Sequence, residues 1–178
     1  MVSRSRLFLF LTGLFVFCSV AVSASPLDRG ISAHESHVDL VETQPLRVPA
    51  APFDTAIKLL KQSLESDAST AQEAGRYLLH SYYLKGTYAV ESSDRKQSIF
   101  AEGKNYGEQL SERFPNNADI QLLYGANLGR WGEAYGIVSA AREGVAGTLR
   151  EIGQRVVELD EEAGDAGGYR MLAQVNYK

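Results

Sequence analysis

From residue 53 onward, apolar residues recur every three or four positions, the spacing of one face of an α-helix. Helix breakers and capping residues divide this pattern into segments. Six helices are predicted, over about 53–64, 69–85, 94–114, 117–136, 138–159 and 169–178. Between the fifth and sixth, Gly164, Gly167 and Gly168 are expected to break the chain. No run of alternating β-branched residues lies between turn residues, so the sequence predicts an all-α fold.

The predicted helices repeat along the chain. Leu64, Leu110 and Val156 stand 46 residues apart, near the ends of the first, third and fifth helices. A polar turn and a tyrosine-containing helix follow each of them. Helix pairs with a period in this range indicate an α-solenoid of antiparallel pairs, of tetratricopeptide or HEAT type, with about two and a half repeats.

Residues 1–24 have the three parts of a secretory signal peptide. Arg4 and Arg6 supply a positive start, an apolar run follows from Leu7 to Val22, and small residues then offer a cleavage site. The apolar run is shorter than the roughly 20 residues that a membrane-spanning helix needs. We therefore expect an exported protein, periplasmic or secreted, with contact to the membrane only if this segment stays uncleaved.

Residues 25–52 hold four of the five prolines and show no sustained periodicity, which predicts a proline-containing linker before a helical repeat domain over 53–178. His34 and His37 stand three residues apart in this segment. Two histidines in a flexible linker make at most a weak metal site, so no metal site is expected. His80, alone on a helix, is expected to be a packed or surface histidine.

The charge of the chain and the absence of catalytic motifs restrict the possible functions further. Without Arg4 and Arg6, 16 basic and 22 acidic side chains remain, a formal charge of −6. An acidic domain repels phosphate backbones, so nucleic acid is not an expected partner. The sequence contains no glycine-rich phosphate loop, nucleophile elbow or HExxH helix, and we expect neither enzymatic activity nor a cofactor.

The fourth helix carries the most distinctive residues. Four glycines on one arc of it, at positions 125, 129, 132 and 136, indicate close approach of a neighbouring helix or of a ligand. Asn127, Arg130 and Trp131 are the candidate recognition residues, because Trp and Arg are enriched at binding hot spots. The alternative is that Trp131 fills a junction between repeats and Asn127 satisfies a helix end. Further tyrosines, including Tyr83, Tyr124 and Tyr135, line a groove in one interpretation and the core in the other.

The segment Ala126–Trp131, which reads ANLGRW, resembles a motif of the tetratricopeptide-like T-component of TRAP transporters. Leu159–Asp160 and Gly167–Leu172 are similar to two further motifs of that family, and the resemblance covers about residues 71–171. It implies a periplasmic, all-helical protein that acts by contact with the transporter's solute-binding protein.

The function expected from this resemblance is that of a non-enzymatic adaptor whose partner is a periplasmic solute-binding protein or a transporter subunit. A module that carries an apolar small ligand between repeats is one alternative. A structural repeat protein that self-associates through its C-terminal helix into a homo-oligomer is another.

Overall fold

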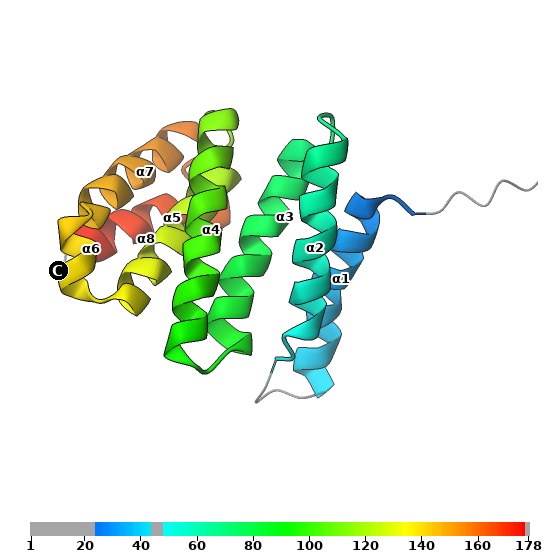
Figure 1. The fold of residues 1–178 in the computed structure, drawn as a ribbon. Helices are drawn as coiled ribbons and strands as arrows, with labels where there is room; N and C mark the ends of the chain where they lie inside the picture. Colours follow the sequence, from blue (N-terminus) through cyan, green and yellow to red (C-terminus); the bar gives the residue numbers. More distant parts are fainter. Residues whose placement is uncertain (1–23, 44–47, 177–178) are drawn as a thin grey trace, which may run out of the picture.

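The computed structural model describes residues 24–43 and 48–176, and every regular element in these two ranges is helical (Figure 1). The predicted all-α fold is therefore confirmed. None of the described helices is both long enough and apolar enough to span a membrane. The elements are α1 (Pro26–Thr43), α2 (Ala51–Ser66), α3 (Ala71–Leu84), the π-helical segment η1 (Lys85–Ala89), α4 (Ser93–Arg113), α5 (Ala118–Tyr135), α6 (Ile137–Arg142), α7 (Val145–Leu159) and α8 (Ala163–Asn176).

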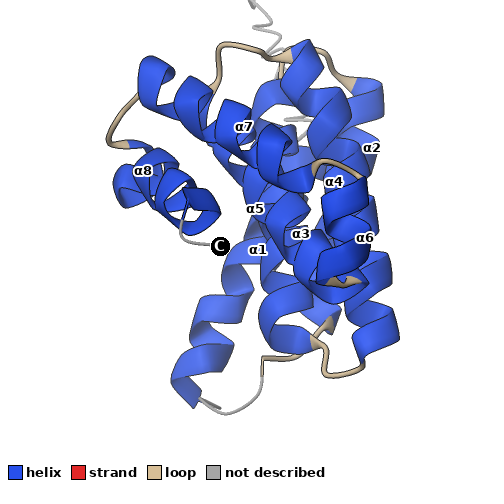
Figure 2. Ribbon diagram, turned by 90° about the vertical axis from the view of Figure 1, so that its left-hand side faces the viewer, coloured by secondary structure: helices blue, strands red, loops and turns tan. Residues whose placement is uncertain are grey.

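The long helices pack mainly against their neighbours in the chain. Helix α2 lies between α1 and α3, α4 packs on α3 and α5, and α7 packs on α5 and α8. Figure 1 shows this succession from α1 at one end of the molecule to α7 and α8 at the other, and Figure 2 views the molecule from the end with α7 and α8. The α-solenoid with two and a half repeats, and the domain boundary at residue 53, stay predictions.

Helix α4 joins two apolar cores. Ile99 belongs to the core built from α1 to α4, whereas its neighbour Phe100 belongs to the core built from α4, α5, α7 and α8. Both side chains are at most 9% exposed. Because consecutive residues of a helix point about 100° apart, one helix can contribute to two cores on different sides.

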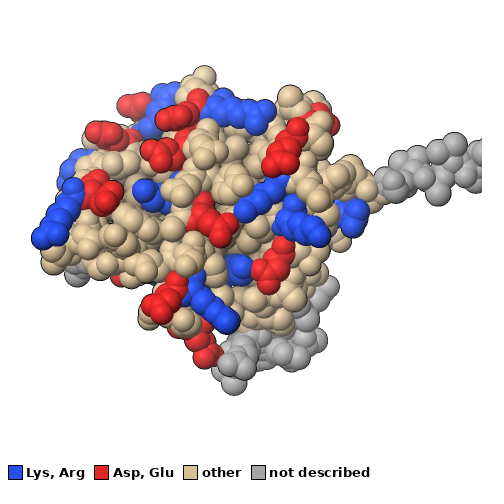
Figure 3. Space-filling view, in the orientation of Figure 1, with Lys and Arg blue, Asp and Glu red and all other residues tan. Residues whose placement is uncertain are grey.

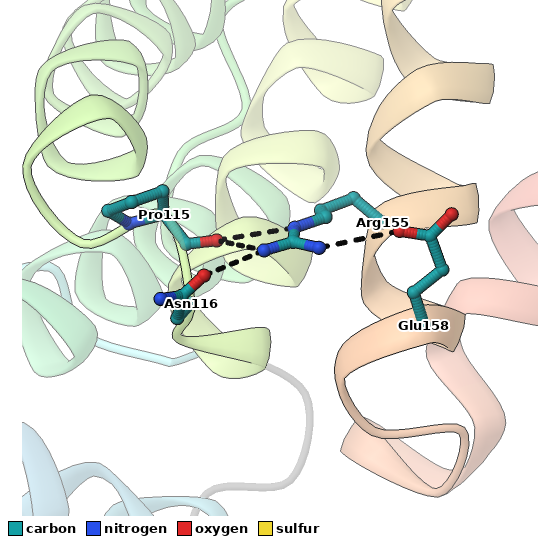
Figure 4. A network of polar contacts seen from close by, with 4 residues as sticks. All are labelled: Pro115, Asn116, Arg155 and Glu158. Carbon is teal, nitrogen blue, oxygen red and sulfur yellow. Dashed lines mark hydrogen bonds and ion pairs between the residues drawn. The ribbon is translucent and has the colours of Figure 1, made fainter.

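The start of α5 follows the prediction. Asn117 precedes the helix, and its side-chain oxygen accepts a hydrogen bond from the backbone N–H of Ile120 at 2.9 Å, which satisfies one of the free donors of the first turn. Arg155 of α7 reaches this loop. Its guanidinium donates to the carbonyl of Pro115 and to Asn116 Oδ1 and pairs with Glu158 (Figure 4). The loop between α4 and α5 is thereby tied to α7.

The prediction of a loose linker over residues 25–52 is wrong for Pro26–Thr43, which form α1. Proline is compatible with the first turn of a helix, where its missing N–H would have no partner anyway. Ser25 and Asp28 cap this turn reciprocally, since each side chain accepts from the other's backbone N–H. Leu27 is buried against α2 and α3, so this segment has a short apolar face despite its proline.

The predicted fifth helix over 138–159 is two helices, α6 and α7. Gly144 separates them with φ +70°, a left-handed conformation that glycine adopts without strain. The apolar periodicity continues across the break because both helices face α5. The apolar pattern of the sequence therefore gives no sign of the turn at Gly144.

The predicted sixth helix begins earlier than Tyr169. Helix α8 starts at Ala163, and after a left-handed turn over residues 164–166 it includes Gly167 and Gly168. These two glycines do not break the chain; they let α8 approach its neighbours closely. A Cβ on Gly168 would lie 2.8 Å from Val157 and 3.1 Å from the carbonyl of Gly153, both in α7.

Candidate functional site

The predicted recognition residues of α5 divide into an exposed group and a buried group. Trp131 and Tyr135 stand four residues apart, so their rings lie on one face of the helix. The rings stack at 4.7 Å between centroids and 19° between planes. Trp131 is 7% exposed, whereas Tyr135 is 44% exposed. The stacked pair therefore extends from the core to the surface.

Two cations lie near this pair, and Lys104 is the one that contacts it. The ammonium group of Lys104 in α4 lies 4.7 Å from the centre of the Trp131 ring, within the range of a cation–π interaction. The guanidinium of Arg130 lies 5.8 Å from the centre of the Tyr83 ring and pairs with Glu133 at 3.0 Å. Three helices thus contribute to one cluster of aromatic and basic side chains.

The pKa of Arg130 is higher than its ordinary value. Burial by itself would lower this pKa, but the interactions of the guanidinium with the Tyr83 hydroxyl and with Glu133 raise it overall. The side chain is nevertheless 40% exposed. Arg130 is therefore a permanent cation that is held in place on one side and accessible on the other.

We call Tyr83, Lys104, Arg130, Trp131 and Tyr135 the aromatic–basic surface. Beside it lies a groove of about 240 Å³ between η1, α4 and α5. The π-helical turns of η1 widen the backbone locally, and such segments are frequent at functional sites. The groove is lined by Gly86, Thr87, Lys96, Phe100, Arg130, Glu133 and Ala134.

Asn127 is fully buried and does not belong to this surface. Its side-chain amide donates to the carbonyls of Leu79 and Leu123, at 3.0 and 2.9 Å, and so joins α5 to α3. Its Oδ1 atom has no hydrogen-bond partner among the described residues and lies over Gly103. These contacts are structural, as in the alternative considered for this residue from the sequence.

Tyr124 is also an interior residue, 8% exposed. Its ring lies directly over Gly107 of α4, where a Cβ would come within 2.6 Å of it. Burial raises the pKa of its hydroxyl, and the nearby carboxylates of Glu108 and Glu112 raise it further. Tyr124 therefore fills the contact between α4 and α5, as in the core interpretation.

Two of the four glycines of α5 face neighbouring helices. A Cβ on Gly125 would meet Met171 and Ile152, and one on Gly132 would touch Ala140 and Val145. Gly136 ends the helix with φ +102°. The close approach is thus by α6, α7 and α8, the first of the two interpretations.

Sequence reasoning did not identify Lys104, Lys96 or the η1 segment. Lys104 is 27 positions from Trp131 in the chain, and nothing in the local pattern marks its contact with that ring. The exposed aromatic ring of Tyr88, 59% accessible, belongs to the same η1 segment. In the parts of the chain that the structure describes, no group of three or more His, Cys, Asp or Glu is placed to hold a metal ion.

No known protein family matches the chain, and no characterised protein or solved structure is significantly similar to it. The predicted signal segment falls almost wholly within residues 1–23, outside the described ranges.

Proposed function

We propose that this protein is an exported, non-enzymatic helical-repeat adaptor that binds a periplasmic solute-binding protein through its aromatic–basic surface. The observation that carries the proposal is the half-exposed Tyr135 ring stacked on the buried Trp131, with Lys104 over the Trp131 ring and Arg130 over the nearby Tyr83 ring. Large aromatic rings and arginine dominate the binding energy of protein interfaces. The resemblance of residues 126–131 to the T-component of TRAP transporters supports the choice of partner.

The arrangement of helices is consistent with a repeat protein. Leu64, Leu110 and Val156 lie two or three residues before the ends of α2, α4 and α7, and each is followed by a second helix that packs on the first. We propose that these are the equivalent positions of about two and a half antiparallel helix pairs. The aromatic–basic surface then lies on the second helix of the middle pair, α5, with contributions from its neighbours.

The charges indicate what the partner presents. Lys104 lies over the Trp131 ring, Arg130 lies over the Tyr83 ring, and Glu133 pairs with Arg130. Elsewhere, on the side shown in Figure 3, acidic and basic side chains are interspersed. We therefore expect a partner face with an apolar centre and one or more carboxylates at its edge.

An apolar ligand carrier is less well supported. The groove beside η1 contains Lys96, Arg130 and Glu133, and a second groove of about 430 Å³ contains four charged residues, Asp54, Lys85, Asp94 and Arg95. Sites for apolar ligands are lined mainly by hydrophobic side chains. Self-association through α8 is distinguishable in solution from the adaptor function, because it needs no second protein.

The test uses purified protein and a purified solute-binding protein from the same cell, with the dissociation constant measured by calorimetry. Tyr135→Ala and Lys104→Ala are expected to weaken binding about tenfold each, because each removes a contact of the aromatic–basic surface. Tyr169→Ala is the matched control, since Tyr169 is an exposed tyrosine, 49% accessible, on α8. Absence of binding by the wild type, or equal losses in all three variants, would contradict the proposal.

A further inference from the structure

The chain has three histidines, and all three lie in one cluster between α1 and α3. The ring of His34 is 5.1 Å from that of His37 in α1 and 4.9 Å from that of His80 in α3, between centroids. His34 is 3% exposed. The aromatic rings of Phe53 and Tyr77 close the cluster from α2 and α3.

The hydrogen bonds of the cluster define the neutral form of His34. The Ser81 hydroxyl donates to the carbonyl of Tyr77 at 2.8 Å, so its oxygen is left to accept from His34 Nδ1–H, also at 2.8 Å. The proton of neutral His34 is therefore on Nδ1, and Nε2 carries none. Protonation of Nε2 would place a positive charge in a buried site.

Burial and the positive charges around the cluster oppose that protonation. Arg76 of α3 lies 4.2 Å from the centre of the Tyr77 ring, next to His34. On α1, the Glu35 carboxylate accepts a hydrogen bond from the Tyr77 hydroxyl at 3.4 Å. On α2, the apolar Phe53 ring lies against both His34 and His37. Burial first, and then His80, His37 and Arg76, lower the pKa of His34 to about 3. Burial, His37 and Arg76 also lower that of His80.

We propose that this histidine cluster is a pH-sensitive switch, in which acidification protonates His34 and His80 and releases α1 from α2 and α3. In the docked state both rings are held neutral, whereas on a released α1 His34 is free to take up a proton, and acid therefore favours release. Helix α1 is suited to this because it is the terminal helix of the described fold and contacts only α2 and α3 extensively. Its departure uncovers Leu60 and Phe53, which are fully buried in the docked state.

Amide hydrogen exchange on the full chain tests the proposal. Protection factors of α1 (Pro26–Thr43) are compared with those of α5 (Ala118–Tyr135) at pH 7 and pH 5. For His34 alone, a change from about 3 in the docked state to 6.5 when released predicts roughly a 20-fold greater loss of protection in α1 between these two pH values. Equal behaviour of α1 and α5 would overturn the proposal.

Two variants identify the groups responsible. The double variant His34→Gln and His80→Gln cannot be protonated at these positions, and its α1 protection is expected to be nearly independent of pH. His37→Gln is the matched control on the same helix and is expected to keep most of the wild-type pH dependence. If the double variant has already lost α1 protection at pH 7, the single variant His80→Gln is measured in its place. It is expected to lose less α1 protection between pH 7 and pH 5 than the wild type does. An unchanged loss in the variant that retains α1 at pH 7 would overturn the proposal.

Discussion

The side-chain amide of Asn127 in α5 donates a hydrogen bond to the backbone carbonyl of Leu79 in α3, 3.0 Å away. Residue 79 lies inside a helix, so its carbonyl also accepts within α3, and the added donor uses its second lone pair. Asn127 is fully buried. The bond therefore joins two helices that are separated by α4 in the chain.

Replacing Asn127 with alanine is expected to lower the free energy of unfolding by about 2 kcal/mol, because it removes two hydrogen bonds and leaves a small cavity. Chemical denaturation monitored by circular dichroism measures this change. Asn105→Ala is the control, since Asn105 is exposed on α4 and is expected to change stability by less than about 0.5 kcal/mol. Equal effects of the two substitutions would show that the bond to Leu79 adds nothing to stability.

Two glycines inside helices predict opposite effects of alanine. Gly129 in α5 has room, because a Cβ there would meet only Leu149 at 3.8 Å. Gly129→Ala is expected to raise the free energy of unfolding by up to about 1 kcal/mol through helix propensity. At Gly107 in α4 the Cβ would lie 2.6 Å from the Tyr124 ring and 3.1 Å from the Tyr124 backbone, which cannot move aside.

Gly107→Ala is therefore expected to lower the free energy of unfolding by about 1–3 kcal/mol, despite the same gain in propensity. Thermal denaturation of both variants in one buffer measures the two signs. A stabilised Gly107→Ala would mean that α4 and α5 can separate without cost. A destabilised Gly129→Ala would mean that its surroundings are tighter than the 3.8 Å contact indicates.

The extent to which the sequence predicts this fold depends on how local each signal is. The predicted end of the third helix near residue 114 and the predicted start of the fourth near residue 117 agree with α4 and α5, because three consecutive residues, Pro115 to Asn117, end the one helix and cap the other. The sequence does not predict α1, because four prolines in residues 25–52 favour a linker, although the one proline inside α1, Pro26, occupies a position where proline is tolerated. The break at Gly144 was missed because the apolar face continues on both sides of it.

In the candidate site, too, contacts within one helix can be predicted from the sequence, whereas contacts between helices cannot. Trp131 and Tyr135 are four residues apart on one helix, so the sequence contains the information that their rings share a face. The burial of Asn127 and Tyr124 depends on how α3 and α4 pack on α5, which no local pattern specifies. The approach of Lys104 to Trp131 is likewise a consequence of helix packing between distant segments. That these residues bind a partner stays a prediction.

The polar contacts of Arg155, which connect α7 to the loop before α5, are expected to contribute little to the free energy of unfolding. Arg155→Ala removes the bonds to Pro115 and Asn116, but the Arg155 side chain is 41% exposed, so water replaces part of what is lost (Figure 4). We expect a loss of about 0.5–1 kcal/mol in the free energy of unfolding. Arg155→Lys keeps the charge without the planar fork and is expected to be intermediate. A loss above 2 kcal/mol would show that the loop depends on Arg155 for its structure.

The bond from the Tyr82 hydroxyl to Glu102 predicts a pH-dependent contribution to stability. Tyr82 is 2% exposed, and its hydroxyl donates to Glu102 Oε2 at 2.7 Å. Burial opposes the charge on Glu102, but the bonds from Tyr82 and Lys61 outweigh it and lower the pKa of the carboxyl below 4.5. A lowered pKa in the folded state means that the ionised carboxylate stabilises the fold above pH 4.5, and this stabilisation is lost as the pH falls below it.

Tyr82→Phe is therefore expected to cost about 1 kcal/mol at pH 7 and progressively less below pH 4.5, where Glu102 becomes protonated. Denaturation curves of the wild type and the variant at pH 7, 5 and 3.5 measure the difference. Tyr106→Phe is the matched control, because the Tyr106 ring stacks on Tyr82 at 6.0 Å while its hydroxyl makes no hydrogen bond with the described residues. A difference between wild type and Tyr82→Phe that stays constant across this range would show that the ionised state of Glu102 is not what the hydroxyl stabilises.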